Sequence, residues 1–98
     1  MARASWTTTG VFAGRGGVRT DEAGIVTGDL TLHTTWDGRL AHVAVQYSGT
    51  SAWFNVAGSP VPCSSAQASR QLHQAAVEAV RVGGGATVPR YDLYGARR

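Results

Sequence analysis

The sequence contains no lysine, a single cysteine (Cys63) and only 6 acidic residues. One cysteine excludes an intrachain disulfide framework and is typical of a protein in a reducing compartment. No apolar run approaches the roughly 18 residues that span a bilayer, and residues 1–20 lack the apolar segment of a signal peptide. We therefore expect a cytoplasmic protein without a membrane partner.

The composition is not that of a disordered chain, because 43% of the 98 residues are hydrophobic and only 15% are charged. A chain of this length predicts a single domain over residues 1–98 with one modest core. All 9 basic residues are arginine. The abundance of alanine, glycine and valine favours a GC-rich gene of bacterial type as the reason why arginine replaces lysine throughout. The alternative is selection for bidentate phosphate or carboxylate contacts, which arginine makes and lysine does not.

The net charge of +3 is unevenly distributed along the chain. Residues 1–20 have three arginines and no acidic residue, and residues 86–98 have three arginines and one aspartate. Residues 21–85 have three arginines against five acidic residues, so the body of the domain is slightly acidic. Any nucleic-acid binding would therefore be weak, salt-sensitive and made by terminal arms. The candidate arm residues are Arg15, Arg19, Arg90, Arg97 and Arg98.

The clearest pattern predicts a β-hairpin over residues 25–47. Residues 26–36 alternate between two kinds of side chain, as in a strand with one buried face. The Asp-Gly pair at 37–38 favours a two-residue type I′ turn, and a loop at these residues fixes the register. That register pairs Leu32 with Val43, Leu30 with Val45, Gly28 with Tyr47, and His33 with His42.

Further strands are predicted over residues 52–57 and 5–12, where β-forming residues are enriched. Residues 13–24, with four glycines, are expected to form a flexible loop. A helix is predicted over residues 65–82, with a capping box from Ser64 to Gln67 and a glycine run that ends it. Its apolar stripe consists of Ala68, Leu72, Ala75, Ala76 and Ala79.

Together these elements predict an α+β fold, an antiparallel sheet of three to four strands with one C-terminal helix packed on one face. Residues 86–98 are expected to begin with a short edge strand at Thr87-Val88 and to continue as a basic C-terminal arm. The sheet face away from the helix is the first candidate site, because an aromatic ring among imidazoles and amides suits a partner or a planar ligand. Its residues are His33, His42, Gln46, Trp53 and Asn55. A solvated face, or one covered by the N-terminal strand, is the alternative.

The remaining motifs do not favour a metal site, a reactive thiol or a phosphate-binding loop. The His33–His42 pair lacks a third metal ligand, because Asp29 lies about 13 Å from His33 along an extended strand. Cys63, just before the predicted helix, has no base or resolving cysteine in the sequence. The Gly-Arg-Gly-Gly run at 14–17 is not followed by a helix or a lysine, as a phosphate loop requires. We expect no metal, no cofactor and no catalytic residue, and the sequence leans against an enzyme.

Two parts of the sequence resemble parts of known protein families. Residues 4–24, with Gly-Arg-Gly-Gly-Val-Arg-Thr, resemble the opening strands of the peroxide-reducing OsmC/Ohr family, but that family uses two cysteines and this chain has one. Three strands followed by an alanine-rich helix resemble part of double-stranded-RNA-binding domains, which carry basic residues where this helix begins. Here that position, residues 63–67, is uncharged.

The sequence therefore favours a non-enzymatic interaction module. We expect it to self-associate, as a homodimer or larger homo-oligomer, through the exposed sheet face or a sheet edge, or to bind another protein. One alternative is a nucleic-acid-binding protein that uses its arginine-rich arms. The other is a small ligand-binding protein or enzyme with a pocket between the sheet and its loops.

Overall fold

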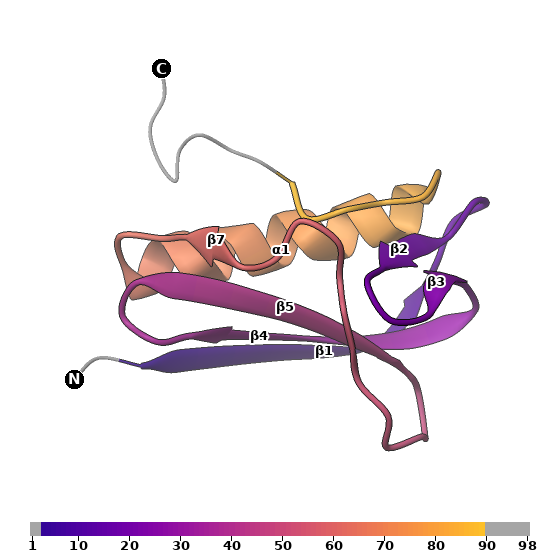
Figure 1. Cartoon of the computed structure of the whole chain (residues 1–98), viewed down its shortest axis with the longest axis horizontal. Helices are drawn as coiled ribbons and strands as arrows, with labels where there is room; N and C mark the ends of the chain where they lie inside the picture. The colour runs from indigo at the N-terminus through magenta and orange to yellow at the C-terminus, as the bar shows by residue number, and fades with distance from the viewer. Residues whose placement is uncertain (1–2, 90–98) are drawn as a thin grey trace.

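The fold is a two-layer α+β arrangement, seen in a computed structural model that describes residues 3–89 (Figure 1). The main sheet is antiparallel, and one helix, α1 (Ala66–Val82), packs against its β1 and β4 strands. The predicted fold class is confirmed. The main sheet consists of β1 (Ala4–Phe12), β4 (Asp29–Trp36), β5 (Leu40–Tyr47), β6 (Phe54–Asn55) and β7 (Val61–Pro62). A second, two-stranded sheet consists of β2 (Val18–Thr20) and β3 (Gly24–Val26).

The strand order in the main sheet is β1-β4-β5-β6, and β7 also pairs with β5. The predicted N-terminal strand is therefore present, and it lies along the outer side of β4. Its pairing is regular from Ala4 to Thr8 and then shifts before Val11. Gly10 has φ 66° within this bulge, a conformation that side-chain-bearing residues rarely adopt. Strand β1 thus forms one edge of the sheet.

The hairpin formed by β4 and β5 corrects the predicted register. Its two-residue loop is Gly38-Arg39, one residue later than expected, and Asp37 closes the turn. The Asp37 carboxylate accepts the backbone N–H groups of Arg39 at 2.9 Å and Leu40 at 2.8 Å, and Gly38 has φ 102°. All cross-strand pairs therefore shift by two residues. Leu30 pairs with Tyr47, Leu32 with Val45, His33 with Ala44, and Thr35 with His42.

The expected pairing of His33 with His42 is therefore wrong. A shift of two residues nevertheless leaves every side chain on its predicted face, because side chains of a strand alternate with period two. Leu30 and Leu32 of β4 still share the buried face with Val43 and Val45 of β5.

The predicted strand from Ile25 is interrupted. Gly28, with φ 96°, separates β3 from β4, so residues 24–26 pair with β2 instead of continuing the hairpin. The segment 13–24, expected to be a loop, therefore contains β2 and the start of β3. Val18 and Val26 face each other in this small sheet and are both buried. The third strand is also shorter than expected, since only residues 54–55 of 52–57 form β6.

Helix α1 begins one residue later than predicted. Ser65, not Ser64, is the N-cap, and its hydroxyl accepts the N–H of Ala68 at 3.0 Å. The helix ends at Gly83, which has φ 81°, as the glycine run predicted. The buried face is rotated from the alanine stripe toward β1. Its residues are Ser69, Leu72, His73, Ala76, Val77 and Val80.

The end of α1 crosses the glycine-rich segment that follows β1. Gly14 donates its N–H to the Val80 carbonyl at 2.9 Å, and residues 84–86 donate to the carbonyls of residues 15–17. The predicted edge strand at Thr87-Val88 is replaced by an isolated bridge between Ala86 and Val18. Most of the predicted basic arm, residues 90–98, lies outside the described residues. Within residues 3–89, no helix is both long and apolar enough to cross a membrane.

Candidate functional site

The helix covers one side of the main sheet and leaves the other side open (Figure 1). We call this open side the free face. It is formed by alternate residues of β1, β4 and β5, with residues 53 and 55 beside them. The side chains of the free face are those of Ser5, Thr7, His33, Thr35, His42, Ala44, Gln46, Trp53 and Asn55.

At the centre of the free face lies an aromatic pair. The rings of His33 and Trp53 have centroids 5.8 Å apart and planes inclined at 51°. His33 Nδ1 lies 2.6 Å from the hydroxyl of Thr7 on β1, which fixes the imidazole orientation. Trp53 remains 44% exposed. The pair therefore presents an apolar surface flanked by polar groups.

The other predicted residues of this face are engaged with their own neighbours. His42 Nε2 lies 3.7 Å from Asp37 Oδ2. Gln46 donates to the Thr50 carbonyl at 2.9 Å. Asn55 Nδ2 donates to a Glu22 carboxylate oxygen at 2.6 Å, and the second Glu22 oxygen accepts the Asn55 backbone N–H. Among residues 3–89, no three histidine, cysteine or acidic side chains are grouped so that they could hold a metal.

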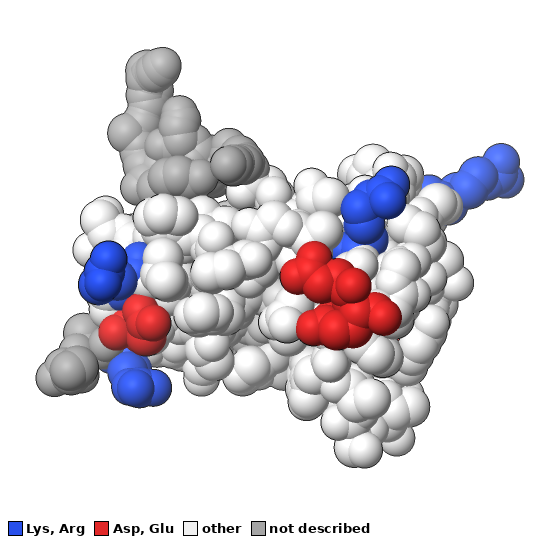
Figure 2. Space-filling model, viewed as in Figure 1, with Lys and Arg blue, Asp and Glu red and all other residues white. Residues whose placement is uncertain are grey.

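The candidate arm residues are only partly described. Arg15 and Arg19 are exposed, and their backbones are tied to the segment after α1, where Gly84 donates to the Arg15 carbonyl and Arg19 donates to the Ala86 carbonyl. Arg90, Arg97 and Arg98 lie outside the described residues. Figure 2 shows the side of the molecule that carries β5 and β7. Acidic and basic side chains lie close together at both of its ends, without a continuous basic patch on the side in view.

The β1 edge is the second candidate surface, and the sequence did not single it out. Strand β1 has 9 residues, whereas β6 and β7 at the opposite edge have 2 residues each. No residue from Ala4 to Phe12 is charged or a proline. An edge strand directs alternate backbone N–H and C=O groups away from its sheet, so a long uncharged edge is a template for another strand.

One indole lies half-buried on the helix side of this edge. Trp6 Nε1 donates to the Ser69 hydroxyl at 3.1 Å, and the Arg70 guanidinium carbon lies 5.9 Å from the centre of the Trp6 ring. The Ser69 hydroxyl in turn donates to the Ala66 carbonyl at 2.6 Å. These contacts hold a large aromatic ring at the edge, between β1 and α1, with a cation above it.

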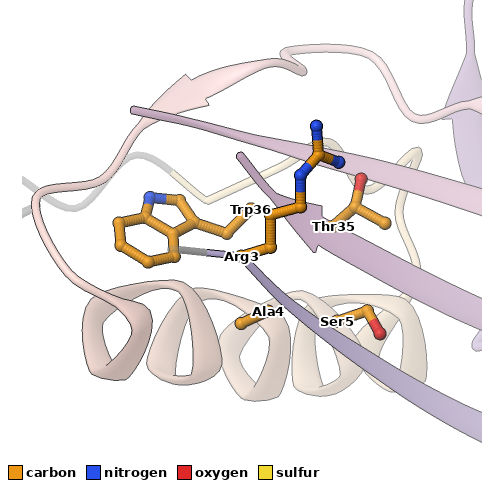
Figure 3. Close-up of a pocket in the computed structure, with 5 residues that line it drawn as sticks. All are labelled: Arg3, Ala4, Ser5, Thr35 and Trp36. Carbon is orange, nitrogen blue, oxygen red and sulfur yellow. The ribbon is translucent and has the colours of Figure 1, made fainter. Parts of the chain in front are cut away.

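Two shallow hollows lie along β1. The first, about 340 Å³, is lined by Arg3, Ala4, Ser5, Thr35 and Trp36. In Figure 3 the Arg3 and Thr35 side chains lie on one side of the strands, and the Trp36 ring points away from them. The second hollow, about 380 Å³, lies where α1 overhangs β1. It is lined by Thr8, Gln74, Val77, Glu78 and Arg81.

Beneath the edge lies His73, which the sequence reasoning also missed. Its side chain is buried in the middle of α1, and its ring nitrogens lie 2.8 Å from the hydroxyls of Thr8 and Thr34. Burial lowers the pKa of His73 from its ordinary value, and the nearby His33 adds to this effect. The four-residue spacing of Ser69 and His73 puts both on one helical face, a signal hidden by the more numerous alanines.

No protein-family model, no curated protein and no solved structure matches this chain. The class that the fold defines is a small α+β domain with one open sheet face and one long free edge.

Proposed function

We propose that this protein is a non-enzymatic interaction module that self-associates through β1. In the proposed dimer, β1 of a second copy pairs antiparallel with β1, so that two sheets form one continuous sheet. A two-fold axis through the strand pair makes the contact identical for both copies. The observation that carries the proposal is a 9-residue edge strand without charge or proline, in a sheet whose opposite edge is formed by strands of 2 residues.

The backbone of β1 supports this contact. Natural proteins protect sheet edges with charged residues, prolines, bulges or very short strands. Here the opposite edge is protected by shortness, and β1 has a bulge only in its second half, near Gly10. Residues 4–8 remain regular. This half of β1 can therefore continue the hydrogen-bond ladder into a second copy.

The side chains of the edge also fit an interface. Tryptophan and arginine are enriched at the energetic centres of protein interfaces. The Arg70 guanidinium lies over the Trp6 ring, and the hydrogen bond from the indole to Ser69 holds the orientation of that ring. On the other side of the strand, Ser5 and Thr7 are exposed hydroxyl residues, which form favourable cross-strand pairs. A second copy would cover the half-buried Trp6 ring.

Sedimentation velocity of the full chain tests the proposal at neutral pH. Ser5→Lys adds a charge to the edge strand on its exposed side and is expected to convert a dimer into a monomer. Ser51→Lys adds the same charge in the exposed connection between β5 and β6 and is the matched control, expected to leave the dimer intact.

Two results would count against edge pairing. The first is a wild-type chain that stays monomeric at high micromolar concentration. The second is a dimer that survives Ser5→Lys. Ser5 also borders the free face, so Trp53→Ala separates the two contacts. An edge dimer is expected to survive Trp53→Ala, and an oligomer that Trp53→Ala dissociates is held through the free face instead.

A further inference from the structure

The contact surface of β1 is held from beneath by one titratable group. His73 projects from α1 into the layer between helix and sheet, where its Nε2 lies 2.8 Å from Thr8 Oγ1 on β1. Its Nδ1 lies 2.8 Å from Thr34 Oγ1 on β4. One imidazole thus connects the helix, the edge strand and the adjacent strand. Thr34 is fully buried and His73 is 4% exposed, so bulk water does not take over these contacts.

The hydrogen bonds of His73 suit a neutral ring. A neutral imidazole has one N–H donor and one acceptor nitrogen, and two threonine hydroxyls can match both by one accepting and one donating. A protonated ring has two donors, so both hydroxyls must accept from it. The hydroxyl hydrogen that had bonded to the acceptor nitrogen then needs another acceptor, in a layer shielded from bulk water. Protonation therefore carries a cost in hydrogen bonding as well as in desolvation.

The charges around His73 do not offset that cost. On the β4 side the titratable group that acts on His73 is His33, a second imidazole. From α1, Glu78 and Arg81 line the second hollow together with Thr8, and Arg81 Nη1 lies 3.5 Å from Glu78 Oε2. Arg70, also on α1, lies over Trp6. Strand β1 has no charged residue. No carboxylate among residues 3–89 forms a hydrogen bond or ion pair with the His73 ring.

We propose that His73 makes self-association through β1 sensitive to acid. When the ring takes up a proton, α1 loosens from β1 and β4, and the edge strand and the Trp6–Arg70 pair lose their fixed arrangement. The dimer then dissociates. This inference rests on the proposed function and names the regulation of the same surface.

The direction of the effect follows from the pKa of His73. Because burial lowers the pKa of this imidazole in the folded chain, the unfolded or loosened chain binds more protons than the native one as pH falls below about 6.5. The native arrangement therefore keeps its full stability above that pH and loses stability below it. If the dimer requires a neutral His73 in both copies, its dissociation constant rises by up to about a hundredfold per pH unit once the ring titrates.

The test combines two measurements on the full chain between about pH 7.5 and about pH 5. NMR signals of the imidazole Cε1–H groups report the titration of His33, His42 and His73 separately, and sedimentation velocity reports the dimer fraction in the same buffers. We expect the pKa of His73 to lie below its ordinary value of 6.5, because its imidazole is buried. We expect the dimer to dissociate along the His73 titration curve.

Two variants separate His73 from the exposed imidazoles. His73→Gln removes the titration and is expected to abolish the steep pH dependence. His42→Gln makes the same change at an exposed position and is expected to leave it unaltered. If His73→Gln does not fold, the agreement between the wild-type titration curve and the wild-type dissociation curve decides the question.

Failure of this inference is distinguishable from failure of the proposed function. A dimer whose affinity is constant over the whole range, or follows His33 or His42, overturns the switch and leaves edge pairing in place. A chain that is monomeric at neutral pH overturns edge pairing and the effect on association with it. Amide exchange along β1 in the same samples then decides whether protonation of His73 still loosens α1, and unchanged exchange overturns that step as well.

Discussion

Gly14 donates its backbone N–H to the carbonyl of Val80 at 2.9 Å, which closes the crossing between the segment after β1 and the last turn of α1. A Cβ atom on Gly14 would overlap the carbonyl oxygens of Arg81 and Val82. Unlike the other glycines of this crossing, Gly14 has no positive φ. The residue is needed for close approach and not for its conformational freedom.

Gly14→Ala should therefore destabilise the domain strongly, by about 3 kcal/mol or more, because the backbone of α1 must move away. Gly84→Ala is the matched control. Gly84 has φ 75°, but a Cβ atom on it would stand in open space, so alanine there costs only the left-handed strain of about 1–2 kcal/mol. Urea unfolding followed by tryptophan fluorescence measures both. Equal losses would mean that the crossing can widen at little cost.

Sequence composition showed that residues 13–24 are rich in glycine but could not show which glycine packs against what. That distinction depends on a contact with residues more than 60 positions later in the chain, at the end of α1. The period-two pattern of β4 and β5 predicted both faces of the sheet, because face assignment needs only local alternation. The register was wrong by two residues because Asp37 closes the turn with its side chain.

The N-cap of α1 can be tested directly, because the sequence predicted Ser64 and the structure has Ser65. Ser65→Ala should cost about 1 kcal/mol, because it removes the acceptor for the Ala68 N–H at 3.0 Å. Ser64→Ala, one residue earlier and also exposed, should change the free energy of unfolding by no more than a few tenths of a kcal/mol. Thermal unfolding of the two variants compares them directly. A larger loss for Ser64→Ala would restore the predicted capping box.

Some residues of the candidate surfaces could be predicted from the local sequence pattern, whereas others depend on long-range packing. His33, His42 and Trp53 could be assigned to one face from alternation alone. The β1 edge could not be identified, because nothing local indicates that β1 pairs with β4 on one side only. His73 was missed because the alanine stripe and the true buried face differ by a rotation of α1, which buries Val77 and Val80 as well as His73.

Acid should weaken the β4–β5 hairpin through Asp37. Two backbone N–H bonds, from Leu40 and Arg39, and the neighbouring His42 hold the pKa of this carboxyl below its usual value of 3.8. The charged form is favoured in the folded chain, so its contribution is complete above about pH 4 and is lost as pH falls through the lowered pKa. Asp37→Asn keeps an acceptor oxygen but should lose this part of the pH dependence.

The Asp37 comparison needs a third variant, Asp37→Ala, which removes the acceptor as well. At pH 7 we expect its melting temperature to fall below that of Asp37→Asn, and both to lie below wild type. Melting curves recorded from neutral pH down to about pH 3 provide the measurement. If Asp37→Asn keeps the acid sensitivity of the wild type in full, another carboxyl group is responsible for it.

Trp36 offers a test of how the segment before α1 is held. Its indole N–H donates to the Cys63 carbonyl at 2.9 Å, and both residues are buried. Trp36→Phe removes the donor and leaves that carbonyl without this partner, at a cost of about 1–3 kcal/mol. Trp53→Phe, at an exposed ring on the free face, is the matched control and should change stability by less than about 0.5 kcal/mol.

The thiol of Cys63 gives a readout that is separate from global unfolding. Burial raises the pKa of this thiol above its ordinary 9.0, so little thiolate is present near neutral pH and a disulfide reagent should modify the native protein slowly. Trp36→Phe should accelerate the modification, because the Cys63 segment opens more often once its carbonyl is released, whereas Trp53→Phe should not. The modification rates of the two variants are compared at the same number of degrees below their melting temperatures. Equal rates would show that the indole hydrogen bond does not hold Cys63 in place.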